Sequence, residues 1–298
     1  MLVGVTGATG FLGRYIVNRL LEAGHRCRCW VRAESDRGGF VDGDLEWIEG
    51  RLNDDASARK LVEGADAVVH AALKRTGPGW SASSDRLVPY LETNLIGSVR
   101  LMETARAAEV ERFVFISTCA VHDVILDDRK LDEAHPLWPR SHYGAHKAAI
   151  EKFVHSFGLG GGWCVCALRP TGIYGVAHPI ERSRWFDLVR RVKRGGKITD
   201  TSGGKEVHAS DVAKAVEILL HAETRAVAGQ AYNCYDLYVA TRDVAQIASE
   251  RCGGSSEIES PHRGPKHQID TSRLRALGMT FGGQALLEKT IGELVEAA

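Results

Sequence analysis

The sequence has no surplus of charge of either sign, because lysine plus arginine and aspartate plus glutamate each total 38 of its 298 residues. A chain without a strong net charge does not attract a polyanion such as nucleic acid or an anionic membrane surface. Long apolar runs are missing as well. Stretches such as residues 65–73 and 113–116 are far shorter than the roughly 20 residues of a membrane-spanning helix. We therefore expect no nucleic-acid partner and no membrane span.

Cysteine is scarce, and its seven residues are too few and odd in number for a disulfide scaffold. A strand-like apolar run begins at residue 2, with no basic stretch or cleavage site before it. We therefore expect a cytoplasmic protein with reduced cysteines. The histidines include a loose group, His122, His135, His142 and His146, whose spacing matches no metal motif, and we predict no metal site.

Short β-rich segments alternate with segments of helical periodicity through the first half of the chain. The expected strands are residues 2–6, 26–31, 45–48, 66–71, 112–117 and 164–168, and the main expected helices are 11–23, 56–63, 87–108 and one from 143. Several of these strands are almost wholly apolar, as strands buried on both faces must be. The pattern predicts an α/β fold, a doubly wound parallel sheet formed by residues 1–175. The shorter elements of residues 176–298 predict a small substrate-capping region that is interleaved with the sheet.

Three glycines punctuate the opening stretch VTGATGFLG at intervals of three. Gly7, Gly10 and Gly13 follow a predicted strand and lead into a predicted helix. In that setting the glycines let backbone N–H groups and a helix N-terminus approach a pyrophosphate. The alternative is a tight turn between strand and helix without a ligand.

A second motif, YGAHK, begins another predicted helix. Tyr143 and Lys147 are four residues apart and share a helix face, and Thr118 ends the fifth expected strand, where open α/β sheets bind their ligands. A phenol with a pKa of about 10 is a poor acid or base at neutral pH, and a nearby ammonium favours its ionised form. The pair is therefore suited to proton transfer. By itself this spacing also fits a solvated helix face.

Together these motifs resemble the extended short-chain dehydrogenase/reductase superfamily, specifically its NAD-dependent epimerase/dehydratase group. Further stretches that carry the resemblance are ADAVVHAAL at 65–73, TNLIGSVRLMETA at 93–105, RFVFISTCAV at 112–121, LRPTGIYG at 168–175 and EVHASDVAKAV at 206–216. The resemblance implies a Rossmann-type sheet, hydride transfer at a nicotinamide, and a helix pair, near 87–108 and 143–157, that allows a homodimer.

The resemblance also implies roles for individual residues. Tyr143 transfers the proton, Lys147 holds the ribose and lowers the pKa of the tyrosine, and Thr118 hydrogen-bonds the reacting oxygen. The cofactor-binding residues that it implies are Gly7, Thr9, Gly10, Phe11, Leu12, Gly13, Arg32, Arg51, Leu52, Ala71, Ala72, Asn94, Ser117, Tyr143, Lys147, Arg169 and Pro170.

Two arginines depart from the pattern of NAD-binding relatives. Arg32 follows Val31 where many relatives have an acidic residue that binds the NAD ribose, and Arg51 replaces an aspartate near the adenine. A guanidinium can pair with the 2′-phosphate of NADP, so we favour NADP over NAD. The alternative for Arg32 is an exposed loop charge.

The substrate is less clearly indicated. His122 stands where many sugar-nucleotide relatives have a tyrosine, and the capping region is short for a nucleotide-diphosphate substrate. The candidate substrate-binding residues are Trp80, His122, His178 and Trp185. Each of them also fits a packed or solvated position.

The sequence thus predicts an NAD(P)-dependent oxidoreductase or epimerase that acts on a secondary alcohol or ketone of a small-molecule substrate, with a sugar nucleotide as one candidate. Two alternatives stay open. One is an NADP-dependent ketone or aldehyde reductase. The other is a non-catalytic dinucleotide-binding regulatory protein, which would not need the Tyr143 and Lys147 pair.

Overall fold

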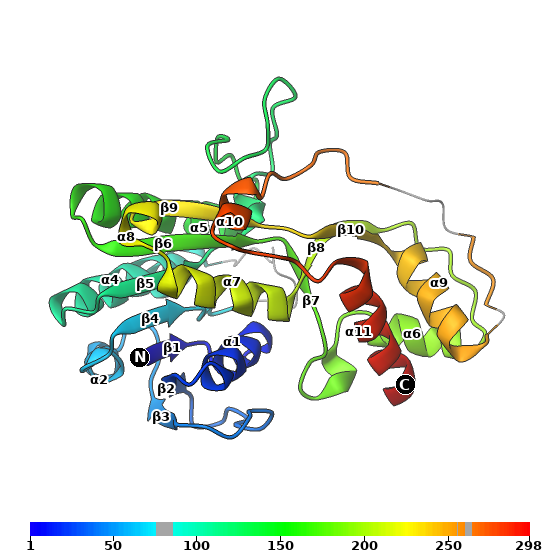
Figure 1. The fold of residues 1–298 in the computed structure, drawn as a ribbon, viewed down its shortest axis with the longest axis horizontal. Coiled ribbons are helices and arrows are strands. Elements are labelled where there is room, and N and C mark those ends of the chain that lie inside the picture. Colours follow the sequence, from blue (N-terminus) through cyan, green and yellow to red (C-terminus); the bar gives the residue numbers. More distant parts are fainter. Residues whose placement is uncertain (76–85, 255, 260–263) are drawn as a thin grey trace. The chain divides into compact units, whose positions relative to one another are not determined.

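We describe a computed structural model of the chain that covers residues 1–75, 86–254, 256–259 and 264–298. The chain divides into two compact units (Figure 1). Unit 1 comprises Met1–Pro170, Val212–Cys234 and Ile269–Met279, and unit 2 comprises Thr171–Asp211, Tyr235–Gln268 and Thr280–Ala298. Each unit therefore contains segments that are far apart in the sequence.

Unit 1 is built on a seven-stranded sheet with the strand order β3-β2-β1-β4-β5-β6-β9. Every neighbouring pair of strands is parallel. The strands are β1 (Leu2–Thr6), β2 (Arg26–Val31), β3 (Leu45–Glu49), β4 (Ala67–His70), β5 (Arg112–Ile116), β6 (Cys164–Pro170) and β9 (Gln230–Cys234). This sheet confirms the predicted doubly wound parallel fold. Because the strands are parallel, all their carboxyl ends lie along one edge, where such folds bind ligands.

Helices cover both faces of this sheet, which explains why its central strands are apolar throughout. One face packs against α2 (Asp55–Val62), α4 (Gly97–Ala107) and α5 (His142–His155), with Phe113, Phe115 and Val165 at the centre of the cluster. Figure 1 places α1 (Phe11–Glu22) and α7 (Ala209–His221) together on one side of the sheet, and an ion pair joins Arg19 to Glu217.

The long helix that the sequence predicts in unit 1 is present, with one irregular turn. The helix expected over 87–108 is α3 (Leu87–Leu91), a π-helical turn (Glu92–Ile96) and then α4. The unit also contains α8 (Thr224–Val227) and α10 (Ser272–Ala276). In the described part of the chain, no helix has the length and apolar character needed to cross a membrane.

Unit 2 holds a three-stranded sheet of β7 (Gly172–Tyr174), β8 (Gly203–His208) and β10 (Leu237–Ala240), in the order β10-β8-β7. Its helices are α6 (Phe186–Lys193), α9 (Thr241–Cys252) and α11 (Gly283–Ala297). These helices pack around an apolar cluster that includes Val189, Val244, Leu287 and Ile291. The unit therefore has a core of its own.

Candidate active site

The turn between β1 and α1 depends on glycine at two positions. Gly7 has φ +75°, and a Cβ there would meet the backbone of Ala71 and Ala72 at 2.8 Å. A Cβ at Gly13 would overlap the carbonyl oxygen of Gly7. These two glycines are therefore needed for the close packing of the turn itself, whether or not a ligand binds.

Gly10 is different, because a Cβ there would meet only the carbonyl oxygen of Gly7, at 3.1 Å. It is the N-cap of α1, and neither a capping side chain nor an acidic first-turn residue covers the N–H groups of Phe11, Leu12 and Gly13. N–H groups without a capping side chain, at the positive end of a helix dipole, suit a phosphate. This turn, with Thr9 directly before Gly10, therefore fits the pyrophosphate of a dinucleotide.

A buried hydrogen-bond chain fixes the adjoining ends of β1 and β4. The ring of His70 lies between two hydroxyl groups, with Nδ1 2.6 Å from Thr6 Oγ1 and Nε2 2.8 Å from Ser98 Oγ. Thr6 Oγ1 also accepts the N–H of Ala72 at 3.1 Å. Burial lowers the pKa of His70 to about 3, so the ring is neutral. Ala71 and Ala72 thus follow a rigid strand end directly beside the glycine turn.

Asn94 shapes the segment that follows. Its amide oxygen accepts the N–H of Lys74 at 2.8 Å, and its amide nitrogen donates to the carbonyl oxygens of Lys74 and Tyr90 at 3.0 and 3.2 Å. The buried side chain therefore holds the backbone after β4 in place. Trp80, a candidate substrate residue, lies outside the described residues.

Two cationic side chains lie near the ends of β2 and β3. Arg32 follows the last residue of β2, its side chain is 70% exposed, and its Nε is 3.4 Å from Glu34 Oε1. Arg51 is exposed after β3, whereas its neighbour Leu52 packs against the core. Most of the Arg32 guanidinium is therefore open to an anion.

The loop between β2 and β3 is held by Arg14, a residue that sequence reasoning missed. Its guanidinium donates to the carbonyl oxygens of Thr9, Asp36 and Gly38 and pairs with the Asp36 carboxylate at 3.1 Å. This buried arginine links the glycine turn to the loop that carries Arg32. A single arginine in an amphipathic helix gives no signal of such a role.

Thr118 and Tyr143 meet at the carboxyl end of β5. Thr118 follows that strand and caps a short 3₁₀ turn, and its side chain is hydrogen-bonded to Tyr143. Tyr143 is the second residue of α5, whose N-cap Ser141 accepts the N–H of Gly144 at 3.1 Å. Because a Cβ at Gly144 would press on the Ala120 carbonyl, glycine there lets the first turn of α5 lie against the turn after β5.

Burial and hydrogen bonding act in opposite directions on Tyr143. Burial raises the pKa of its hydroxyl group, the Thr118 hydrogen bond lowers it, and the neighbouring Cys119 raises it further. A second tyrosine that the sequence did not single out, Tyr90, donates or accepts a 2.9 Å hydrogen bond with His146 Nδ1. The His146 ring lies 5.6 Å from that of Tyr143, and packing of this kind holds the Tyr143 ring in one orientation.

Lys147 lies one helical turn beyond Tyr143 and is only 4% exposed. Its Nζ donates to the carbonyl oxygen of Ile116 at 2.7 Å and sits 4.5 Å from the centre of the Phe115 ring. Burial lowers the pKa of Lys147 to about 7, and Glu151 opposes that shift. The ammonium is thus held at the carboxyl end of β5, near which Thr118 and Tyr143 also lie.

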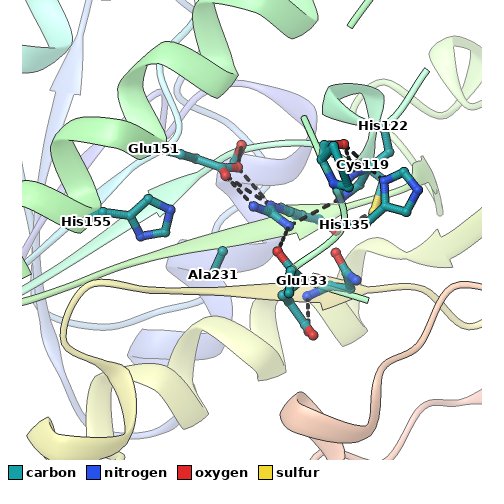
Figure 2. A network of polar contacts seen from close by, with 12 residues as sticks. Cys119, His122, Glu133, His135, Glu151, His155 and Ala231 are labelled. Carbon is teal, nitrogen blue, oxygen red and sulfur yellow. Dashed lines mark hydrogen bonds and ion pairs between the residues drawn. The ribbon is translucent and has the colours of Figure 1, made fainter. Parts of the chain in front are cut away.

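Arg169 is buried and belongs to a polar network, in which Figure 2 labels His122, Glu133 and Glu151. Its guanidinium contacts the Glu151 carboxylate, the carbonyl oxygen of Glu133 at 3.1 Å and His122 Nε2 at 3.2 Å. Ser117 Oγ donates to the same Glu151 carboxylate. Arg169, Ser117 and His122, three of the predicted ligand-binding residues, therefore direct their side chains into this network, and His122 is a packed histidine of 5% exposure. Pro170 ends β6 directly after Arg169.

Two candidate substrate residues belong to unit 2. Trp185 has φ +71°, and its ring lies 5.2 Å from that of Tyr174 and 5.4 Å from the Arg184 guanidinium. His178 precedes a cis proline, Pro179. In the residues that the structure covers, no group of three His, Cys, Asp or Glu is arranged to hold a metal ion.

The sequence matches one family model and several known proteins. A model of the NAD dependent epimerase/dehydratase family matches residues 3–234. The chain is 30% identical over 191 residues to a Mycobacterium tuberculosis (strain CDC 1551 / Oshkosh) 3 beta-hydroxysteroid dehydrogenase/Delta 5-->4-isomerase, covering 62% of the chain and 50% of the relative. It is also 30% identical over 234 residues to a Stigmatella aurantiaca 4-hydroxy-2-methyl-3-oxo-4-farnesyl-3,4-dihydroquinoline-1-oxide ketoreductase, covering 76% and 66%.

The fold is matched over the whole chain. The crystal structure of a Thermus thermophilus UDP-glucose 4-epimerase in complex with NAD superposes with a TM-score of 0.79 at 25% identity, and each chain is covered fully. The chain spans about half the length of the mycobacterial dehydrogenase.

Proposed function

The chain belongs to the NAD-dependent epimerase/dehydratase family, and from that premise we propose that it is an NAD(P)-dependent oxidoreductase or epimerase acting on a secondary alcohol or ketone. The observation that carries the proposal is the contact between Thr118 and Tyr143, with Lys147 one turn further along α5. A dinucleotide-binding protein without catalytic activity needs the glycine turn but has no use for a buried, hydrogen-bonded proton-transfer group.

The chain's own residues divide the chemistry between them. Tyr143 takes the hydroxyl proton when an alcohol is oxidised and returns it to the oxygen when a ketone is reduced. Thr118 orients the reacting oxygen, and the Lys147 ammonium favours the phenolate of Tyr143. The bound nicotinamide supplies the hydride acceptor or donor.

The dinucleotide would be held along the carboxyl edge of the sheet. The turn from Gly7 to Gly13 fits the pyrophosphate, and Ala71 and Ala72 lie beside it. Arg32, open to solvent at the end of β2, supports a 2′-phosphate and therefore NADP. Unit 2, with Trp185 and His178, would supply the substrate-binding region.

Two substrate classes follow from the relatives' names. A steroid dehydrogenase and a quinoline-oxide ketoreductase act on hydroxyl or keto groups of ring systems, and a UDP-glucose epimerase acts on a sugar nucleotide. Arg32 favours the reductase reading, because a reductase exchanges its cofactor in every cycle and NADPH is the usual source of hydride. We therefore place an NADP-dependent ketone reductase beside the epimerase as the second candidate.

A homodimer belongs to the same proposal. Val88 of α3, Ile96 of the π-helical turn and Phe153 of α5 are apolar side chains that are 65%, 46% and 41% exposed. A dimer formed through these helices would remove these side chains from water. Sedimentation of the purified chain distinguishes a dimer from a monomer.

The experiment that tests the function follows the purified chain with NADPH and NADH against cyclic ketones, steroids and UDP-sugars. A reductase consumes one reduced cofactor for each ketone reduced. An epimerase converts its sugar nucleotide without net consumption of cofactor. A chain that binds the dinucleotide but turns over no member of either class would contradict the proposal and favour the regulatory protein.

A further inference from the structure

The carboxylate of Glu151 is fully occupied by donors other than Lys147. Arg169 Nε lies 3.0 and 3.1 Å from its two oxygens, Arg169 Nη2 lies 2.6 Å from Oε2, and Ser117 Oγ donates to Oε1 (Figure 2). The side chains of Arg169 and Glu151 are 1% and 0% exposed. The two-pronged guanidinium is therefore the dominant partner of this carboxylate.

Lys147 lies four residues before Glu151 on the same face of α5. Oppositely charged side chains at this spacing attract each other, and the attraction grows when water is excluded. Lys147 Nζ nevertheless donates to the Ile116 carbonyl, at 2.7 Å. Without Arg169, Glu151 would be the natural partner of this ammonium.

We propose that Glu151 and Arg169 are positioning residues that act through Lys147. Arg169 holds the Glu151 carboxylate, and Lys147 consequently keeps its contact with the carbonyl at the end of β5, beside Thr118 and Tyr143, instead of pairing along the helix. This inference rests on the proposed function of Lys147 beside Tyr143.

Among the other groups around Lys147, none offers a charge that could take the place of Glu151. His70 of β4 and His146 of α5 both feel the Lys147 charge, and burial lowers the pKa of each to about 3, so that both are neutral. Phe115 of β5 presents a ring face. Glu151 is the charged group that raises the pKa of Lys147 against the effect of burial.

The test is a direct titration of Lys147 by NMR, in protein labelled with ¹³C at lysine Cε. The spectrum of Lys147→Met identifies the signal. We expect a midpoint near 7 in the parent, because burial lowers the pKa to about 7. Glu151→Gln should lower the midpoint, and Arg169→Gln, which frees the carboxylate, should raise it by about one pH unit.

The double variant Glu151→Gln/Arg169→Gln separates an indirect effect from a direct one. If Arg169 acts through Glu151, the double variant keeps the midpoint of Glu151→Gln alone. Glu133→Gln is the matched control, because its carboxyl group is in the same network but accepts the N–H of Asn233 rather than Arg169. It should leave the midpoint of Lys147 unchanged.

Two results would overturn the inference. One is an equal Lys147 midpoint in the parent and in Glu151→Gln. The other is a change of that midpoint by Arg169→Gln that is the same in the presence and in the absence of Glu151. If a single variant fails to fold because its buried charge lacks a partner, the uncharged double variant decides: a midpoint below that of the parent supports the inference, and an equal midpoint overturns it. The titration needs no turnover, so an inactive substrate panel contradicts only the proposed function.

Discussion

Arg32 is the residue on which the choice of cofactor depends. Its guanidinium is largely exposed, and its contact with Glu34, at 3.4 Å between two exposed side chains, is too weak to occupy it. A charge-assisted hydrogen bond to a 2′-phosphate contributes about 1.5 to 3 kcal/mol. Arg32→Ala should therefore weaken NADP binding by roughly tenfold or more and leave NAD binding unchanged.

Calorimetric titration of both oxidised cofactors measures this directly. Arg37→Ala is the matched control, since Arg37 belongs to the same loop but its guanidinium lies over the Trp47 ring, 5.9 Å from its centre. Equal affinities of the parent for the two cofactors, or a preference that survives Arg32→Ala, would show that Arg32 is only a solvated charge.

Single residues also show which features of the site could be predicted from the sequence. Tyr143 and Lys147 could be paired from their spacing, because one helical turn fixes their shared face. Glu151 lies one further turn along the same helix face, but the spacing does not reveal its partner, Arg169 of β6. The contact of Arg169 with His122 joins a strand to a loop 47 positions away, and no periodicity reports where a loop returns. These two side chains were expected near ligands, and the structure places both in a buried network.

Among the elements, the β1–α1 turn separates two kinds of glycine. Gly13 lies against the backbone of Gly7 and Ala8, so Gly13→Ala should destabilise the fold. A Cβ at Gly10 would meet only the carbonyl oxygen of Gly7, at 3.1 Å, so a shift of a few tenths of an ångström accommodates it. We expect Gly10→Val to keep the thermal midpoint within a few degrees of the parent while losing dinucleotide affinity by at least tenfold.

Calorimetry and thermal melting together check this prediction. Gly160→Ala is a control for the general cost of replacing a glycine that, like Gly10, has no positive φ, because a Cβ there meets nothing within 4 Å. If Gly10→Val bound NAD(P) as the parent does, the glycine turn would not be the phosphate site.

Strands were predictable from the sequence where it presents an apolar or β-rich run, including the half-exposed β3. The apolar strands β4, β5 and β6 are buried along their length and lie where the sequence placed them. β7 has three residues and β8 begins with two glycines, so neither presents an apolar run or a clear alternation. The small sheet of unit 2 therefore emerged only from the structure.

For the molecule as a whole, buried histidines predict acid sensitivity. Burial lowers the pKa of His70, His122 and His146 to about 3, whereas the unfolded chain takes up these protons below about 6.5. Unfolding therefore takes up protons in this window, and stability present above pH 6.5 is lost as the pH falls toward 3. Each of these histidines lowers the free energy of unfolding by up to about 2 kcal/mol at pH 5.

Glu206 acts in the opposite direction, because burial raises its pKa to about 7 and the folded state binds its proton more readily. Burial also lowers the pKa of His208, to about 4, so that four histidines act against Glu206, and we expect a net fall of about 5 kcal/mol in the free energy of unfolding between pH 7 and pH 5. Urea unfolding at the two pH values measures it, and His122→Gln should reduce the fall. A stability that does not change with pH would contradict the neutral state of these rings.

The most direct measurement is the effect of Tyr143→Phe on turnover, with the substrate that the panel identifies. The variant keeps the ring and removes the hydroxyl group that moves the proton. We expect kcat to fall by about 10² to 10⁴ while the Kd of the dinucleotide stays nearly unchanged. Tyr232→Phe, which removes from β9 a hydroxyl group that donates to the carbonyl oxygen of Ala226 in α8, should keep full activity. If the kcat of Tyr143→Phe stays within about threefold of the parent, the loss is much smaller than that expected for a positioned acid and base. That result would contradict the central role of Tyr143.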